Sequence, residues 1–265
     1  MGVGLMIETA IKAAKMAGEK LEYYFETILE KEEKEDKSFV TKADREADEI
    51  IINLIKETYP NHQIVTEENG TLGDKNEYSW FVDPLDGTLN FTRGLPIFAT
   101  SIAVVRNAEP IAAVIYNPIT NSLYTAEKGK GAFWNGERIL VSETTELKDS
   151  IVSMGRSRSP ENKEKALGFY NRFYHQLKSQ RVLGSSALEL AWVAAGRLEG
   201  FISVGLNSWD FFGGVLLVQE AGGLVTDLDG KPWSSACTHF LASNGRIEKD
   251  LLRVINSWQR VFLGE

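Results

Sequence analysis

Apolar residues recur along the chain with two different spacings, which together predict a mixture of helices and strands. In residues 5–29, side chains such as Met6, Ala13 and Leu21 recur mostly at steps of three and four, the period of an amphipathic helix. The same spacing, with start and stop residues, predicts further helices over 41–57, 160–176, 187–195, 209–221 and 246–261. Shorter apolar or alternating runs predict strands over 63–65, 80–82, 98–105, 111–116, 122–126, 131–134, 150–154, 181–183, 201–204, 224–227 and 240–242.

The order of these elements predicts a layered α/β fold. Residues 98–135 contain only strands separated by turns, which is typical of an antiparallel meander, whereas the second half alternates strands with helices. The charged run 30–37 is predicted to be a solvated loop. We expect a single domain over residues 1–265, because no other linker, repeat or low-complexity segment interrupts the pattern.

Composition excludes several classes of partner. The chain has 265 residues and a net charge of −8, from 29 basic and 37 acidic residues, with no long run of Lys and Arg. We therefore expect neither nucleic acid nor a membrane surface as the main partner. No apolar run reaches the length of a transmembrane span and no signal peptide is evident, so the prediction is a cytoplasmic protein. A single cysteine, Cys237, is compatible with a reducing compartment.

Two carboxylates follow a short apolar strand. The run 80–82 predicts a buried strand, and Asp83 comes directly after it. Pro84 cannot continue the ladder, so we expect the chain to leave the sheet there and the turn to bring Asp86 back beside Asp83. Two adjacent anions need a counter-charge, which a divalent metal ion supplies compactly. The alternative is an ordinary turn, since Asp-Pro and Asp-Gly are common turn dipeptides.

Gly87 and Thr88, the next two residues, are typical of a helix start. A glycine lets the backbone approach a ligand closely, and the free N–H groups of a helix start suit phosphate. Both residues are therefore candidate phosphate-binding residues.

Three more carboxylates lie after a predicted strand or at the start of a predicted helix. Glu67 follows the strand 63–65, Asp44 lies three residues after Thr41 in a capping-box pattern, and Asp210 lies in the first turn of the apolar helix 209–221. Each has a plain explanation: a solvated turn for Glu67, and a favourable helix dipole for the two aspartates. Close to Asp83, Glu67 and Asp210 become candidate metal ligands.

Two residues of the second half are weaker candidates for substrate contact. Arg156 follows the strand 150–154 and would offer a cation to an anionic substrate, although exposed arginines are common. Ser186 precedes the helix 187–195, where the simplest role is that of an N-cap.

Four motifs, in order along the chain, resemble those of the inositol monophosphatase family. Residues 80–91 (Trp-Phe-Val-Asp-Pro-Leu-Asp-Gly-Thr-Leu-Asn-Phe) resemble its first signature, and Trp209-Asp210 followed by residues 220–223 (Glu-Ala-Gly-Gly) resembles its second. Residues 67–68 and 40–44 fall at the family's spacing upstream. The resemblance covers nearly the whole chain and implies a five-layer α-β-α-β-α sandwich of the sugar phosphatase type. It also implies the hydrolysis of phosphate monoesters with Mg²⁺.

The resemblance also implies a set of metal ligands. Glu67, Asp83 and the carbonyl of Leu85 would hold a first Mg²⁺ ion, and Asp83, Asp86 and Asp210 would hold a second. A third, weaker metal would lie near Glu67. Carboxylate and carbonyl oxygens are the ligands that this hard cation prefers.

Catalytic roles follow from the same resemblance. Asp44 and Thr88 would form a hydrogen-bonded pair, and Thr88 with Glu67 would orient the attacking water. The expected mechanism is a direct in-line attack by metal-activated water, without a nucleophile from the protein.

Two departures from the family pattern concern the substrate. Ser203 stands where inositol-specific members have a glutamate that holds sugar hydroxyls, and Arg156 stands where they have a small hydroxyl residue. These changes favour a more anionic or differently shaped alcohol. Inositol 1-phosphate remains the first expectation. Fructose 1,6-bisphosphate, histidinol phosphate, adenosine 3′,5′-bisphosphate and NADP are the alternatives.

The resemblance implies a homodimer and leaves open a role of another class. Some bacterial relatives bind transcription machinery, so a non-catalytic regulator is the alternative to an enzyme. Five placed carboxylates argue for the enzyme, since a pure binding module has no need of them.

Overall fold

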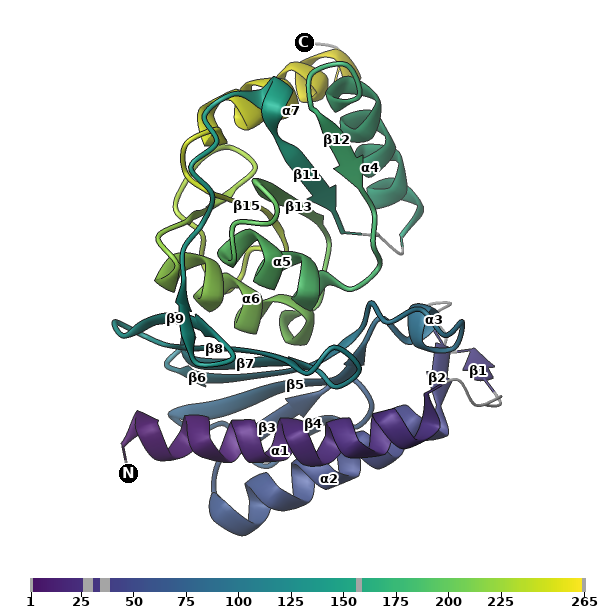
Figure 1. Ribbon diagram of the computed structural model, residues 1–265, viewed down its shortest axis with the longest axis vertical. Helices are drawn as coiled ribbons and strands as arrows, with labels where there is room; N and C mark the ends of the chain where they lie inside the picture. Colours follow the sequence, from purple (N-terminus) through teal and green to yellow (C-terminus); the bar gives the residue numbers. More distant parts are fainter. Residues whose placement is uncertain (1, 26–30, 34–38, 156–158, 264–265) are drawn as a thin grey trace.

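The described residues form alternating layers of helix and sheet (Figure 1). A computed structural model describes residues 2–25, 31–33, 39–155 and 159–263. From the bottom of Figure 1 upward, the layers are α1 and α2, an eight-stranded sheet, α5 and α6, a five-stranded sheet, and α4 with α7. The five-layer α-β-α-β-α sandwich expected from the sequence is thereby confirmed.

The helices follow the predicted apolar periodicity closely. Their bounds are α1 Val3–Tyr24, α2 Lys42–Thr58, α3 Thr88–Phe91, α4 Pro160–Phe173, α5 Ser186–Ala194, α6 Ser208–Glu220 and α7 Glu248–Leu263. Helix α6 is buried along almost its whole length because it lies between the two sheets, which explains why its sequence is apolar on every side.

The large sheet is mostly antiparallel. Its strands lie in the order β10-β9-β8-β7-β6-β5-β3-β4. In chain order their bounds are β3 Gln63–Thr66, β4 Gly70–Leu72, β5 Tyr78–Asp86, β6 Ala99–Arg106, β7 Glu109–Asn117, β8 Ser122–Glu127, β9 Gly131–Trp134 and β10 Glu137–Ile139. From β5 to β10 each strand pairs with the next in sequence, so the meander predicted over 98–135 is present and extends by one strand at each end. Strands β3 and β5 are parallel.

The small sheet combines parallel and antiparallel pairs. Its strands lie in the order β12-β11-β13-β15-β14, with bounds β11 Ile151–Met154, β12 Ser179–Arg181, β13 Gly200–Val204, β14 Leu224–Asp227 and β15 His239–Ser243. Strand β11 is parallel to both β12 and β13. The carboxyl ends of these three strands therefore lie along one edge of the small sheet.

Apolar cores pack the helices against both faces of each sheet. One core joins α1 and α2 to the large sheet, with Trp80 fully buried in it. A second lies between the sheets around α5 and α6, and a third joins the small sheet to α4 and α7. Each strand face in these cores is covered by helix, so strands such as β6 read as continuous apolar runs.

The structure corrects several local predictions. Strand β5 does not end at Pro84: it continues to Asp86 through a register shift, and Asp86 pairs with Ala99. The shift is a bulge, one of the few places in a sheet where proline is tolerated. The N-cap of α5 is Ser185, one residue before the predicted Ser186, and the N-cap of α6 is Asn207.

Part of the predicted charged loop is a strand. Residues Lys31–Glu33 form β1, which pairs antiparallel with β2, Phe39–Thr41. The other residues of the charged run lie outside the described part of the chain. Strand β12 also starts two residues earlier than the predicted strand 181–183.

Across the described ranges, none of the helices is both long enough and apolar enough to cross a bilayer.

The close approach of α5 and α6 depends on Gly214, which generates a first prediction. A Cβ atom at Gly214 would lie 2.4 Å from the Cβ of Leu190 on α5. Gly214→Ala should therefore lower the free energy of unfolding by roughly 1 to 3 kcal/mol, measured by urea denaturation. Gly4→Ala in α1, where a Cβ meets nothing within 4 Å, is the matched control and should not destabilise the protein. Equal stability of Gly214→Ala and the wild type would contradict this packing.

Candidate active site

Parallel pairing of β3 and β5 brings the first two acidic residues together. In this pairing Thr66 lies opposite Val82, and the backbone N–H of Glu67 donates to the carbonyl oxygen of Val82 at 3.1 Å. Glu67 and Asp83 are the residues that follow this pair. Their side chains therefore leave the same edge of the large sheet next to each other.

The start of α6 adds a third carboxylate. Asp210 lies in its first turn, and its Oδ2 accepts a hydrogen bond from the backbone N–H of Asn207 at 2.9 Å. One oxygen each of Glu67, Asp83 and Asp210 lie within 4.8 Å of one another. Asp83 is only 1% exposed. The three residues thus form a cluster of oxygen atoms, which we call the carboxylate cluster.

The turn after β5 requires a glycine. Gly87 has a φ of 98°, and a Cβ at this position would lie 2.9 Å from the carbonyl oxygen of Ile97. A side chain would be strained in both respects. The turn places Asp86 before it and Thr88, the first residue of α3, after it.

Asp86 connects the large sheet to the start of α5. Its Oδ2 accepts hydrogen bonds from the Oγ of Ser185 and from the backbone N–H of Ala187, both at 2.7 Å. Asp86 therefore caps α5 from another part of the chain. It does not belong to the carboxylate cluster defined above, although its charge acts on Asp83.

A hydrogen-bonded pair lies at the start of α2. The Oγ1 of Thr88 is 3.1 Å from Oδ1 of Asp44 and 3.2 Å from the carbonyl oxygen of Leu85. Its single proton can be donated to only one of these two acceptors at a time. Asp44 is held in place by Thr41, whose backbone N–H and hydroxyl donate to Oδ2 at 2.8 and 2.6 Å.

Burial and mutual repulsion disfavour ionisation of these acids. Burial raises the pKa of Asp83 well above its ordinary value, and the charges of Glu67, Asp86 and Asp210 raise it further. Burial likewise raises the pKa of Asp44 and of Asp86 to about 6 in each case. Holding these acids together in their ionised form therefore costs free energy.

The donor set fits a hard divalent cation. The cluster offers carboxylate oxygens alone, the ligand type that suits Mg²⁺ or Ca²⁺, whereas zinc and copper sites use imidazole or thiolate. A cation bound among these oxygens would offset the repulsion that raises the pKa of Asp83.

The chain matches known proteins over nearly its whole length. The sequence model of the inositol monophosphatase family matches residues 5–259. The chain belongs to this family. Nus factor SuhB of Escherichia coli K12 is 39% identical over 251 residues, which cover 93% of this chain and 94% of that protein.

Two similar proteins come from Thermotoga maritima. Its fructose-1,6-bisphosphatase/inositol-1-monophosphatase is 37% identical over 251 residues, covering 94% of this chain and 95% of that protein. A solved IMPase structure from the same organism superposes with a TM-score of 0.90 at 36% identity, covering 96% of this chain and 98% of that one. Both the sequence and the fold are therefore those of the inositol monophosphatase family.

Of the three residues expected to contact substrate, two lie in the described part of the chain. Arg156 lies outside the described residues. Ser186 is buried as the first residue of α5. Ser203 is also buried, and its Oγ donates to the carbonyl oxygen of Thr238 at 2.8 Å. While this bond is made, the Ser203 hydroxyl can contact a substrate only as a hydrogen-bond acceptor.

Sequence reasoning missed two polar residues beside the site. Ser185 binds Asp86, but spacing alone could not decide which of two adjacent serines does so. Glu189 is fully buried in α5, and burial raises its pKa to about 8. Its Oε1 accepts the backbone N–H of Leu183 at 3.3 Å. An acid inside the otherwise apolar run 187–195 was the available signal.

The raised pKa of Asp83 generates a second prediction. At pH values above 3.8, the ordinary pKa of this carboxyl, Asp83 loses its proton in the unfolded chain but keeps it in the folded chain. Rising pH therefore favours unfolding. Asp83→Asn removes this cost. In the presence of a chelator at pH 7, the variant should unfold with a higher free energy than the wild type in urea denaturation.

The pH dependence and a control sharpen this test. The difference between Asp83→Asn and the wild type should grow from about pH 4 to pH 7. The exposed Asp74 provides the matched control, and Asp74→Asn should follow the wild type at each pH. A less stable Asp83→Asn protein without metal would show that burial and repulsion of the Asp83 charge do not dominate its contribution to stability.

Proposed function

We propose that this protein hydrolyses small phosphate monoesters in a Mg²⁺-dependent reaction, and that inositol 1-phosphate is the first substrate to test. The observation that carries the proposal is the carboxylate cluster, whose three oxygens lie within 4.8 Å of one another. Membership of the inositol monophosphatase family and a relative named fructose-1,6-bisphosphatase/inositol-1-monophosphatase support it.

The proposed metal ligands are Glu67, Asp83, Asp86, Asp210 and the carbonyl oxygen of Leu85. When bound, Mg²⁺ would lower the pKa of a coordinated water molecule and offset the charge of the phosphate. The protein contributes the fixed positions of these oxygens. Asp83 accepts the backbone N–H of Leu85 at 3.0 Å, so one oxygen of this carboxylate is held in a fixed direction.

Thr88, Asp44 and Glu67 are proposed to orient the attacking water. When Thr88 donates its proton to Asp44, at 3.1 Å, its oxygen can accept a proton from water. An ionised Asp44 can only accept, which fixes the direction of this bond, and its pKa of about 6 allows ionisation at neutral pH. Gly87 and Thr88 are the proposed phosphate contacts, since the backbone at Gly87 carries no side chain to keep a ligand away.

A panel of phosphate esters tests the proposed function. Inositol 1-phosphate, fructose 1,6-bisphosphate, histidinol phosphate, adenosine 3′,5′-bisphosphate and NADP would be compared by phosphate release with Mg²⁺, using kcat/KM. We expect turnover of at least one ester that stops with excess chelator and returns when Mg²⁺ is added. Turnover that survives strong chelation, or a trapped phosphoenzyme, would contradict the mechanism.

The carboxylate cluster generates a third prediction. Glu67→Gln should lower kcat by about 10²-fold or more, because it removes a metal ligand and a group that orients water. Glu68→Gln is the matched control, since Glu68 is the adjacent carboxylate outside the cluster. This control should keep most of the activity. Similar losses in both variants would argue for a general charge effect instead.

The Thr88 hydroxyl generates a fourth prediction. Thr88→Val keeps the shape of the side chain and removes the bond to Asp44, so kcat should fall by about 10²-fold with a smaller change in KM. Thr88→Ser keeps the hydroxyl and should retain activity within about tenfold. A serine variant as inactive as the valine variant would assign Thr88 a purely structural role.

A regulatory role is the second candidate, favoured by the relative named Nus factor SuhB. The Glu67→Gln protein separates the two candidates. It should lose phosphate release, while any binding to a protein partner that does not use the metal site should persist.

A further inference from the structure

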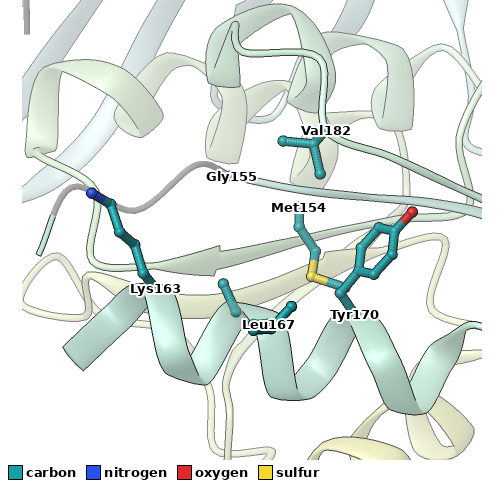
Figure 2. A pocket seen from close by; sticks show the side chains of 7 residues that line it. Met154, Gly155, Lys163, Leu167, Tyr170 and Val182 are labelled. Atoms are coloured by element: carbon teal, nitrogen blue, oxygen red, sulfur yellow. The ribbon is translucent and has the colours of Figure 1, made fainter. Parts of the chain in front are cut away.

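A cavity of about 460 Å³ lies between α4 and the ends of β11 and β12. Figure 2 shows Lys163, Leu167 and Tyr170 projecting from α4 towards Met154 at the end of β11 and Val182 just after β12. Its volume lies within the range of about 300 to 1,000 Å³ that is usual for small-molecule sites. None of the residues assigned to the metal or the phosphate lines it.

The cavity lies where a layered α/β sheet usually binds ligands. Strand β11 continues into α4 on the outer face of the small sheet, whereas the parallel strand β12 continues into α5 on the inner face. Two neighbouring parallel strands whose connections leave in opposite directions open a crevice at their carboxyl ends. Gly155 and Val182, which follow these two strands, both line the cavity.

The loop after β12 joins this cavity to the candidate active site. Val182 lines the cavity, and Ser185, three residues later, donates to Asp86 at 2.7 Å. Three residues span at most about 11 Å of extended chain. Between them, the carbonyl oxygen of Leu183 accepts the side-chain N–H of Asn90 at 2.7 Å. The loop is thus fixed to the segment that carries Thr88.

The lining of the cavity is apolar. Met154, Leu167, Tyr170 and Val182 supply most of the wall, and none of the described lining residues is acidic. Leu167 and Val182 are 53% and 52% exposed, so their apolar surfaces are available to a solute. The exposed Lys163 can line the wall with its aliphatic stem while its ammonium group stays in water. A polyol such as inositol presents no apolar group to such a surface.

We propose that this cavity is a subsite for an apolar part of the leaving alcohol, so that the preferred phosphate monoesters carry an alkyl or aryl group. This inference rests on the proposed phosphatase function.

Binding of non-hydrolysable ligands tests the subsite apart from catalysis. Calorimetry with Mg²⁺ would compare ethyl-, butyl-, hexyl- and phenylethylphosphonate, and kcat/KM would be measured for the matching phosphate esters. The Kd should fall along the series by up to roughly fourfold for each methylene group that becomes buried. A Kd that does not change with chain length in the wild type overturns the subsite.

Leu167→Asp places a charge in the cavity wall and should remove the dependence of Kd on chain length. Val182→Asp makes the same test from the opposite wall, in case the first variant folds poorly. Leu140→Asp is the matched control, because Leu140 is 64% exposed and lies after β10, away from the cavity. This control should retain the wild-type dependence. Chain-length dependence that persists in both cavity variants also overturns the subsite.

The two measurements separate this inference from the proposed function. Phosphonates that bind with the expected trend, without turnover of any ester, would refute the phosphatase and retain the subsite. Turnover of ethyl phosphate with no effect of chain length on Kd or kcat/KM would retain the phosphatase and refute the subsite.

Discussion

Repulsion among buried carboxylates is the constraint on which the rest of this structure depends. Asp83 is 1% exposed, and three other acids act on it. A folded chain accepts this arrangement only if the backbone fixes the acids or a cation is bound among them. The scaffold therefore has two tasks: to bring the ends of β3 and β5 and the start of α6 together, and to prevent the charged groups from moving apart.

Backbone hydrogen bonds accomplish the second task. Each of the four aspartates accepts a backbone N–H: Asp44 from Thr41, Asp83 from Leu85, Asp86 from Ala187 and Asp210 from Asn207. Three of these bonds lie at helix starts, where a carboxylate is favoured in any protein. Two interpretations of Asp44 and Asp210 are therefore compatible: they stabilise helix starts, and they are candidate site residues. The same bond that stabilises the helix gives the carboxylate a fixed direction.

The sequence predicted most of the elements because their patterns are strong and local. The apolar period of α1, the meander from β6 to β9 and the acids at strand ends needed no information from elsewhere in the chain. Local patterns could not show that β5 passes Pro84 through a bulge, because the bulge depends on pairing with β6. They also could not show that Ser185 meets Asp86, 99 residues away. The layer order and the ligand roles came from the family resemblance, which summarises such long-range contacts.

In the proposed function, the two sheets would divide recognition of a phosphate ester between them. The large sheet supplies Glu67 and Asp83 from paired strands and positions Asp86 and Thr88 through a turn that only glycine fits. The small sheet presents the ends of β11 and β12, where side chains on α4 complete an apolar cavity. The loop 182–185 connects this cavity to Asp86, and no residue of α4 supplies one of the clustered carboxylates. Changes on α4 could therefore alter the proposed alcohol subsite while the carboxylate cluster, positioned by the large sheet and the start of α6, stays in place.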